Sequence, residues 1–246
     1  MGIRNSCGIP ARRAASWATL VVLLALAADR SSAQLNWEGQ GGVFLNALPF
    51  TTAPGRYEAS THYINLDRLG EVTTFSVAAG LRGNVEIGLT RITSGVSGVP
   101  SQNVVPVKWF FQTETPTRPA VAAPLIARDL VGVGGATDLG LSAAKVVKIG
   151  TSTVLLDLGV RSTKVVGNGL FGKASGARIK WEGSAAVFVT KTLILGTEFK
   201  EQIGGRTWTD LALRYIASDR VNVDLGVANF GPAINNQVAV GVTVKL

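Results

Sequence analysis

Cysteine is almost absent from the sequence. The 246 residues include one, Cys7, which lies ahead of an apolar run near the N-terminus. This position, before the run rather than at its end, excludes a lipoprotein acylation site. If the N-terminal region is removed on export, as argued below, the mature chain has no thiol. Disulfides, thiolate metal sites and a cysteine nucleophile are then excluded, and stability must come from packing and backbone hydrogen bonds.

Histidine is equally scarce, because His62 is the only one. Zinc sites built on histidine use several nitrogen or sulfur ligands, so a single histidine excludes a site of that kind. A catalytic histidine in a phospholipase or protease needs serine or aspartate partners in a recognisable local motif, and none surrounds Thr61-His62-Tyr63. We therefore expect no catalytic residue, no metal, no cofactor and no enzymatic activity.

Long apolar runs are absent after the first 33 residues. Before that point, three arginines precede the apolar stretch 14–28, and the small residues 31–33 follow it. This order is typical of a secretory signal peptide, here 1–33, with Gln34 as the mature N-terminus. The stretch is shorter than the roughly 20 residues of a membrane-spanning helix. We expect export to the periplasm, the outer membrane or the medium, without a transmembrane helix.

Charge of one sign is not concentrated anywhere. The chain has 24 basic and 16 acidic residues, a formal net charge of +8. Without residues 1–33 the counts fall to 20 and 15, an excess of five basic groups spread along the chain. Nucleic-acid-binding surfaces cluster their basic residues, so no nucleic-acid partner is expected. The mean hydropathy of +0.29 is high for a soluble all-β domain.

What the sequence does contain is strict alternation, clearest in the final 27 residues, 220–246. In 221–227 and again in 238–246, every second residue is aliphatic, and the residues between them are small, polar or charged. Alternation places the two sets on opposite faces of a strand. In a soluble sandwich the aliphatic face forms the core, whereas in an outer-membrane barrel it contacts lipid.

The number and length of similar segments favour the barrel. About twelve of them follow one another, each close to the 9–11 residues that a tilted membrane strand needs. The expected strands are 57–66, 71–81, 84–92, 103–112, 125–134, 138–149, 151–164, 177–190, 192–201, 207–217, 220–228 and 236–246. We predict an all-β fold, a single antiparallel transmembrane β-barrel spanning 57–246 in the bacterial outer membrane. Its partners would be outer-membrane lipid and the barrel-assembly machinery.

The connections agree with this topology, with longer ones outside and short turns in the periplasm. One connection, 113–124, is long but falls on the periplasmic side. With an even number of strands, the first strand begins and the last strand ends on the periplasmic side. The segment 34–56, which precedes the first strand, then has no place in the wall. We therefore predict that this segment lies in the lumen or under the rim.

Charged residues gather on the face predicted to point inward. They could be a selectivity lining for a polar solute, or ion pairs that fill and rigidify a closed lumen. Twelve strands lie between small filled barrels and open porins of 16–18 strands, which favours a closed or plugged lumen. The candidate lumen-lining residues are Glu86, Asp157, Arg161, Lys180, Glu182, Glu198, Lys200, Asp210, Arg214 and Asp224.

One glycine pattern resembles a nucleotide-binding motif. Residues 167–172 read Gly-Asn-Gly-Leu-Phe-Gly, but the dinucleotide fingerprint requires a strand before it and a helix after it. Here the following residues alternate as a strand, so we interpret this segment as a loop tip.

Short motifs spread over most of the mature chain resemble a known family. They are Trp-Glu-Gly-Gln-Gly-Gly at 37–42, His-Tyr-Ile-Asn at 62–65, Gly-Asn-Val-Glu-Ile-Gly-Leu-Thr-Arg at 83–91 and Leu-Gly-Thr-Glu-Phe at 195–199. The chain resembles exported bacterial outer-membrane barrels of unknown function, related to those encoded beside exopolysaccharide genes. This resemblance implies a location and a fold, and it offers no catalytic residues.

Two functions remain open at this point. The first is passive passage or binding of a small solute at the outer membrane. The second is a structural or assembly barrel of the cell envelope, or a polysaccharide-export partner, without channel activity.

Overall fold

A computed structural model describes residues 35–42, 44–66, 69–230 and 236–246. The predicted signal peptide 1–33 lies outside the described residues, as does Gln34. No helix among the described residues is long and apolar enough to cross a membrane.

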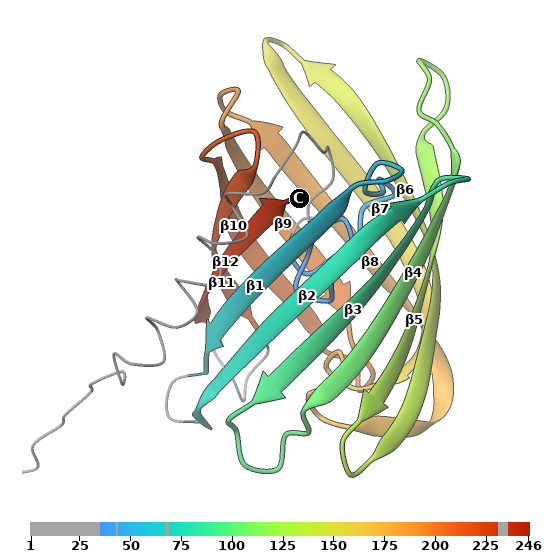
Figure 1. Cartoon of the computed structure of the whole chain (residues 1–246), viewed down its shortest axis with the longest axis vertical. Helices are drawn as coiled ribbons and strands as arrows, with labels where there is room; N and C mark the ends of the chain where they lie inside the picture. The colour runs from blue at the N-terminus through green and yellow to red at the C-terminus, as the bar shows by residue number, and fades with distance from the viewer. Residues whose placement is uncertain (1–34, 43, 67–68, 231–235) are drawn as a thin grey trace, which may run out of the picture.

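Twelve antiparallel strands form one closed barrel, in which each strand pairs with its neighbours in sequence and β1 pairs with β12 (Figure 1). The strands are β1 (Tyr57–Asn65), β2 (Glu71–Leu81), β3 (Val85–Ser94), β4 (Gln102–Gln112), β5 (Ala120–Leu130), β6 (Gly134–Ile149), β7 (Ser152–Val165), β8 (Lys173–Phe188), β9 (Leu193–Glu201), β10 (Thr207–Ile216), β11 (Val221–Asn229) and β12 (Gln237–Lys245). The predicted fold class is therefore confirmed.

Alternation assigns the two faces of the wall as predicted. Along β11, Leu225 and Val227 are exposed, whereas Asn222, Asp224 and Gly226 are buried. Large apolar side chains, several of them aromatic, are exposed on every strand of the barrel, because side chains of alternate residues point away from the lumen. The exposed aromatic residues on the strands include Tyr57, Trp109, Phe111, Trp181 and Tyr215. The interior, by contrast, holds most of the buried charged residues.

Four predicted boundaries were wrong by four or five residues. Two of them lie at the turn between β5 and β6. Strand β5 ends at Leu130 rather than at 134, and β6 begins at Gly134 rather than at 138, because the Val133 amide donates to the Leu130 carbonyl at 2.8 Å and closes a tight turn. Strand β5 begins at Ala120 rather than at 125, so the connection after β4 covers only 113–119. Pro124 lies within β5 opposite Lys108, and alternation continues through it because proline loses only the ladder bond that its own N–H would donate. Strand β8 begins at Lys173 rather than at 177, because β7 and β8 stay paired as far as Val165 and Lys173, past an irregularity in the register.

The two ends of the barrel differ. We call the end with the connections 82–84, 113–119, 150–151, 189–192 and 217–220 the short-turn end; β1 begins there and β12 ends there. We call the opposite end the long-loop end. Its connections include 95–101, 166–172 and 202–206.

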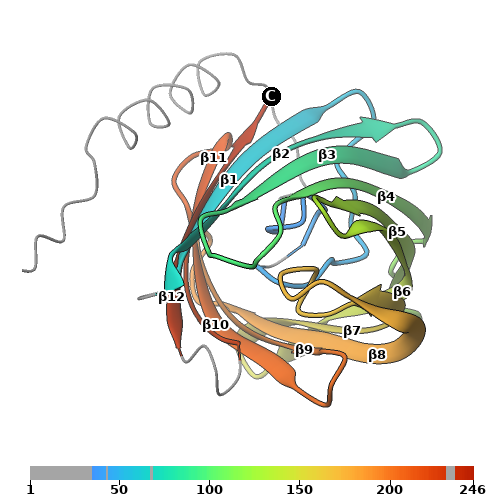
Figure 2. The same cartoon turned by 90° about the horizontal axis from the view of Figure 1, so that it is seen from below.

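The first described residues lie inside the barrel (Figure 2). We call residues 35–53, of which 43 is not described, the plug. Residues 35–42 and 44–49 are all buried. The chain leaves the lumen past β2, where the Gly55 amide donates to the Gly80 carbonyl at 2.8 Å. A Cβ on Gly80 would lie 2.1 Å from the Ala53 carbonyl oxygen, so the crossing requires glycine.

Candidate functional site

The plug folds on itself before it contacts the wall. The Asn36 side-chain oxygen accepts hydrogen bonds from the amides of Glu38 and Gln40, both at 3.0 Å. The Leu48 amide donates to the Gly41 carbonyl at 3.0 Å, which closes a second turn. These local bonds satisfy backbone groups that water cannot reach. The plug is therefore a compact, folded segment in the lumen.

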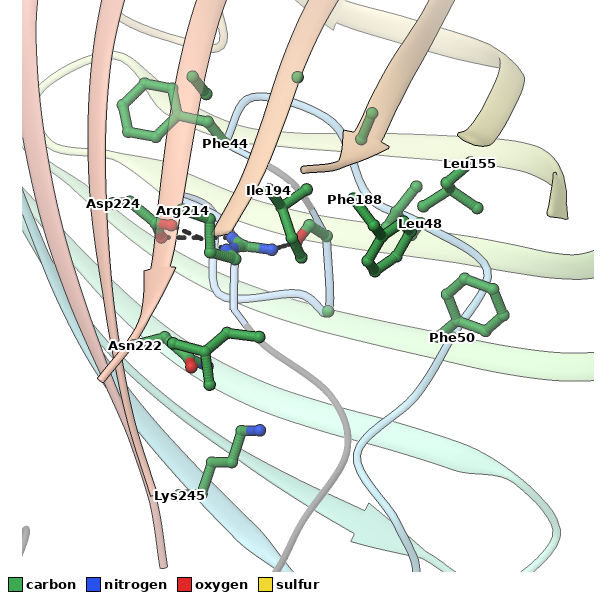
Figure 3. A pocket seen from close by; sticks show the side chains of 16 residues that line it. Phe44, Leu48, Phe50, Leu155, Phe188, Ile194, Arg214, Asn222, Asp224 and Lys245 are labelled. Carbon is green, nitrogen blue, oxygen red and sulfur yellow. Dashed lines mark hydrogen bonds and ion pairs between the residues drawn. The ribbon is translucent and has the colours of Figure 1, made fainter. Parts of the chain in front are cut away.

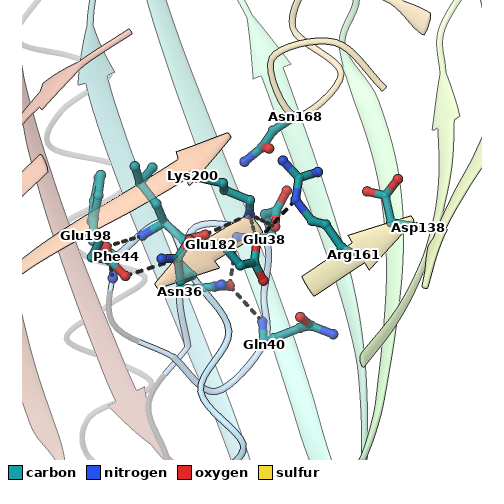
Figure 4. Close-up of polar contacts among 12 residues, drawn as sticks. Asn36, Glu38, Gln40, Phe44, Asp138, Arg161, Asn168, Glu182, Glu198 and Lys200 are labelled. Atoms are coloured by element: carbon teal, nitrogen blue, oxygen red, sulfur yellow. Dashed lines mark hydrogen bonds and ion pairs between the residues drawn. The ribbon is translucent and has the colours of Figure 1, made fainter. Parts of the chain in front are cut away.

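Glu38 is the centre of an ion-pair network that joins the plug to two sides of the barrel. Figure 4 shows Glu38 beside Lys200 and Glu182. Its carboxylate lies 2.6 Å from the Arg128 guanidinium of β5 and 3.1 Å from the Lys200 ammonium of β9. Arg128 also contacts Asp138 at 3.0 Å, and Lys200 contacts Glu182 at 3.6 Å. All five side chains are almost completely buried. Each charge is thus compensated by opposite charges, which a buried ion requires.

The surroundings of Glu38 keep it ionised. Burial alone would raise the pKa of Glu38, but the positive charges of Arg128, Lys200 and Arg161 lower it from an ordinary 4.5 to about 2. At neutral pH the plug therefore carries a full negative charge into a pocket of cations.

A second set of wall residues binds the backbone of the plug. Glu198 accepts hydrogen bonds from three consecutive amides, those of Phe44, Leu45 and Asn46, at 2.9, 2.6 and 3.0 Å. Hydrogen bonds to an ionised acceptor are shorter and stronger than neutral ones. Because they engage main-chain N–H groups, they depend on the path of the plug rather than on its side chains.

The opposite wall binds the plug in the same way. Glu86 of β3 accepts from the amides of Gly41 at 2.8 Å and Thr52 at 2.7 Å. Lys108 of β4 donates to the carbonyls of Gly41 at 2.8 Å and Leu48 at 3.0 Å. The plug is therefore held from several sides of the lumen at once.

Close approach explains the glycines of the plug. A Cβ on Gly42 would lie 2.2 Å from the Asn46 carbonyl oxygen, and one on Gly41 would lie 2.7 Å from the Phe50 carbonyl oxygen. Both contacts are with backbone, which cannot move aside as a flexible side chain could. The run at 39–42 thus follows from packing inside the lumen.

Apolar side chains seal the lumen toward the long-loop end. Trp208 packs edge-on against Phe230 with ring centroids 4.6 Å apart, and against Trp37 of the plug at 6.4 Å. The glycine-containing loop 166–172 folds inward, so that Leu170 is buried in the same cluster. Gln102 donates to the Asn168 carbonyl of this loop at 3.2 Å. As predicted, this segment connects two strands, and here it serves as part of the seal.

A cavity remains toward the short-turn end, between the plug and the wall (Figure 3). Its volume is about 280 Å³. Most of its lining is apolar and includes three phenylalanines, Phe44 and Phe50 of the plug and Phe188 of β8. Arg214 and Asp224 form an ion pair on one side at 2.8 Å, and Arg214 also donates to the Gly42 carbonyl at 3.1 Å.

Most of the predicted lining residues contact the plug or pair with one another inside the lumen. Glu86, Glu198, Lys200 and Arg214 contact the plug directly. Glu182 joins Arg161 at 3.1 Å and Lys200 at 3.6 Å. Asp157 accepts from Ser142 at 2.8 Å, and the Ser142 hydroxyl also reaches the plug at the Ala47 carbonyl. The remaining pairs are cross-strand neighbours, namely Asp210 with Glu198, Asp224 with Arg214 and Lys180 with Arg161.

Four residues of the site were not in the predicted set: Glu38, Lys108, Arg128 and Asp138. Lys108, Arg128 and Asp138 lie on the inward phase of their strands, so alternation could have identified them. In β4 and β5, however, the signal is weakened by Pro106 and Pro124. Glu38 is the only acidic residue of the segment 34–56, and that could have indicated a partner among the lumen cations.

His62 lies inside the barrel, where it contacts the plug and a neighbouring strand. It is buried, with its ring 5.7 Å from that of Phe44 and its Nδ1 atom 3.3 Å from the Thr74 hydroxyl. Among the described residues there is no group of three or more histidine, cysteine or acidic side chains that could hold a metal ion. His62 packs against the plug.

The pair formed by Asp210 and Glu198 allows a stability prediction. The two carboxylates are buried and face each other across β9 and β10, and like charges directly opposite are destabilising. We expect Asp210→Asn to increase the free energy of unfolding by about 0.5–1 kcal/mol, because it removes the repulsion and keeps the shape. The matched control, Asp224→Asn, should decrease it, since Asp224 pairs with Arg214. Urea unfolding of both variants measures this, and a less stable Asp210→Asn protein would contradict it.

Comparison with solved structures identifies known barrels of the same fold. The NanC porin aligns with a TM-score of 0.56 over 77% of this chain and 100% of its own, at 11% sequence identity. The KdgM porin aligns with a TM-score of 0.55 over 77% of this chain and 98% of its own, at 9% sequence identity. The outer membrane protein Omp33 of Acinetobacter baumannii aligns with a TM-score of 0.53 over 78% of this chain and 98% of its own, at 10% sequence identity. At such low identity the similarity shows the fold alone, that of porin-type outer-membrane barrels.

Sequence comparison identifies a family as well. No curated protein matches the chain significantly. The profile described as "Protein of unknown function (DUF3034)" matches residues 121–245, which run from the second residue of β5 to the last residue of β12. That match covers half of the chain and eight of the twelve strands. The chain therefore belongs to the DUF3034 family of proteins of unknown function.

Proposed function

We propose that the protein is an outer-membrane β-barrel that holds its lumen closed with its own plug and passes a small polar solute when the plug is displaced. One observation carries this proposal: the charged groups of the lumen bind the plug. Glu38 forms ion pairs with cations of β5 and β9, and Glu198 and Glu86 accept hydrogen bonds from amides of the plug. The conformation described is thus the closed one.

The outer face supports the proposed location. Aliphatic and aromatic side chains are exposed around the whole wall, a surface that water does not favour and that a lipid bilayer accommodates. The similarity in fold to the NanC and KdgM porins and to Omp33 agrees with this. Outer-membrane lipid and, during insertion, the barrel-assembly machinery are the partners that we propose.

The composition of the lumen supports a polar solute. Once the plug leaves, the wall presents carboxylates, ammonium and guanidinium groups and hydroxyls, which suit a hydrated molecule. The KdgM porin has been solved in complex with disordered oligogalacturonate. Its similarity in fold makes an oligosaccharide the first solute to test on this barrel.

The apolar seal favours a second function. The cluster around Trp208, Phe230 and Trp37 is built from aliphatic and aromatic side chains, and it must open as well for passage to occur. A barrel that never opens would instead be a structural or assembly component of the envelope. The resemblance to exopolysaccharide-associated barrels, read from the motifs at 37–42 and 195–199, would then indicate a polysaccharide-export partner.

Deleting Gly39–Leu48 separates the two functions. We expect the deletion to increase single-channel conductance in planar bilayers severalfold, because it removes the segment that fills the lumen. The barrel should still form, since every strand of the wall lies outside the deleted residues. Heat-modifiable migration in gels checks the fold. A folded deletion variant that conducts no better than the full mature chain would favour the structural function.

A further inference from the structure

The cavity at the short-turn end is enclosed by apolar side chains of both the plug and the barrel wall. Its walls include Phe44, Leu48 and Phe50 of the plug, together with Leu155, Phe188 and Ile194 of the barrel. The volume of about 280 Å³ is slightly below the range of roughly 300–1,000 Å³ typical of small-molecule sites. An apolar space of this size accommodates a short hydrocarbon body.

One cation lies at the edge of this cavity. Lys245 is the last residue of β12, half-buried, and its ammonium points into the space in the close-up (Figure 3). It forms no ion pair with any residue in the described part of the chain. The other cation of the lining, Arg214, is already paired with Asp224 and the Gly42 carbonyl. Lys245 is thus the group positioned to bind an added anion.

We propose that this cavity is a binding site for a small amphipathic monoanion, with a short apolar chain between the phenylalanines and a carboxylate at Lys245. The apolar walls provide the burial energy, and the lysine selects the charge. The lining includes the last residues of β8, β10 and β12, namely Phe188, Ile216 and Lys245, and the second residues of β9 and β11, namely Ile194 and Asn222. The ligand therefore enters from the short-turn end, which in the proposed orientation faces the periplasm.

The site has a regulatory consequence, and this part rests on the proposed function. Because the plug supplies one wall of the cavity, the complete site exists only while the plug is docked. A ligand that binds one conformation only stabilises that conformation. Occupancy of the cavity should keep the barrel closed. The binding site itself does not depend on whether the barrel ever conducts.

Octanoate and octan-1-ol are suitable probes, because they share a chain and differ in charge. We suggest titrating each into the mature protein in lipid nanodiscs, with isoleucine methyl groups labelled for NMR. Ile194 and Ile216 line the cavity, whereas Ile87 and Ile179 are exposed on the outer face and report partition into lipid. Octanoate should shift the cavity methyl resonances at concentrations that leave the outer ones unchanged, and it should bind more tightly than the alcohol.

Variants assign the roles. Lys245→Gln should weaken octanoate binding about tenfold, as expected for loss of one charge-assisted hydrogen bond, and leave octan-1-ol binding unchanged. Ala186→Leu, which fills the cavity, should abolish both. Lys148→Gln changes an exposed lysine at the same end and serves as control. Equal shifts at all four isoleucines, or octanoate affinity unaffected by Lys245→Gln, would overturn the site. Binding without an effect on conductance would overturn only the regulatory consequence.

Discussion

Glu38→Gln is expected to release the plug from the lumen. The substitution removes the charge that compensates Arg128 and Lys200, and breaking a buried ion pair on one side costs about 3–5 kcal/mol. The loss should fall toward the lower figure, because each cation keeps a second carboxylate, Asp138 at 3.0 Å and Glu182 at 3.6 Å. The wall has its own ladders of hydrogen bonds, so the barrel should remain folded.

Plug release can be measured with a single cysteine. The mature chain has none if cleavage follows residue 33, so Ala47→Cys, at a position 5% exposed in the plug, is a unique reporter. Maleimide should label it slowly in the parent and many times faster after Glu38→Gln. Glu114→Gln is a matched control, because Glu114 pairs with Lys145 at 3.4 Å where both are partly exposed and such pairs contribute little. Unchanged labelling in Glu38→Gln would show that backbone hydrogen bonds suffice to hold the plug.

The same residue predicts how the closed state depends on pH. The pKa of Glu38 falls from 4.5 to about 2 when the plug is docked, so docking favours the ionised form. The contribution of Glu38 to the stability of the docked plug is therefore fully present above pH 4.5 and is lost as the pH falls toward 2. The parent protein should label slowly from pH 7 to pH 5 and faster below about 4, whereas Glu38→Gln should lack this acid-dependent step.

Leu225→Arg is expected to impair insertion into lipid. Leu225 is 48% exposed on the outer face and lies midway along β11, between Leu213 of β10 and Val240 of β12. Arginine at the bilayer midplane of a barrel costs about 2–4 kcal/mol. Urea titrations of folding into lipid vesicles should show a loss of that size.

The control for this prediction is the same substitution at another depth. Ile149 is 62% exposed beside the turn between β6 and β7, where arginine costs about 0–1 kcal/mol. An inward position such as Asn222 is unsuitable, because it is 1% exposed inside the filled lumen. Equal costs at Leu225 and Ile149 would indicate that the outer face contacts water rather than lipid.

Alternation predicted the wall well, because one physical constraint repeats at every second residue. Where the outer face is apolar and the inner one polar, as in β11 and β12, faces and bounds were right to within a residue or two. The errors fell where proline or small residues weaken the contrast, namely at the start of β5, at the turn between β5 and β6, and at the start of β8. At the starts of these strands, pairing with the neighbouring strand extends the strand beyond the predicted bound. The sequence of a single segment does not reveal that pairing.

The contents of the lumen were predictable only in part. The even number of strands predicted that 34–56 lies in the lumen or under the rim, and alternation placed Glu198 and Lys200 on the inner face. Which inner residues meet the plug depends on the stagger of twelve strands and on the path of a segment without regular structure. Glu38 and Arg128 are 90 residues apart in the chain, and no local pattern records their contact. Lys180 shows the converse: it lies on the inward phase of β8, opposite Arg161, but no hydrogen bond or ion pair links it to the plug residues that the structure describes.

The distribution of plug contacts also sets an order of events during folding. The first described residues of the chain bind partners on β3, β4, β5, β9 and β10, and Gly42 and Arg214 are separated by 172 positions. Contacts of such long range cannot form until the intervening chain has been arranged, because loop closure must precede them. The N-terminal segment is synthesised first and, by this reasoning, is the last to reach its native position. The wall must therefore assemble around an empty interior, and substitutions in the plug should alter the rate of unfolding more than the rate of folding.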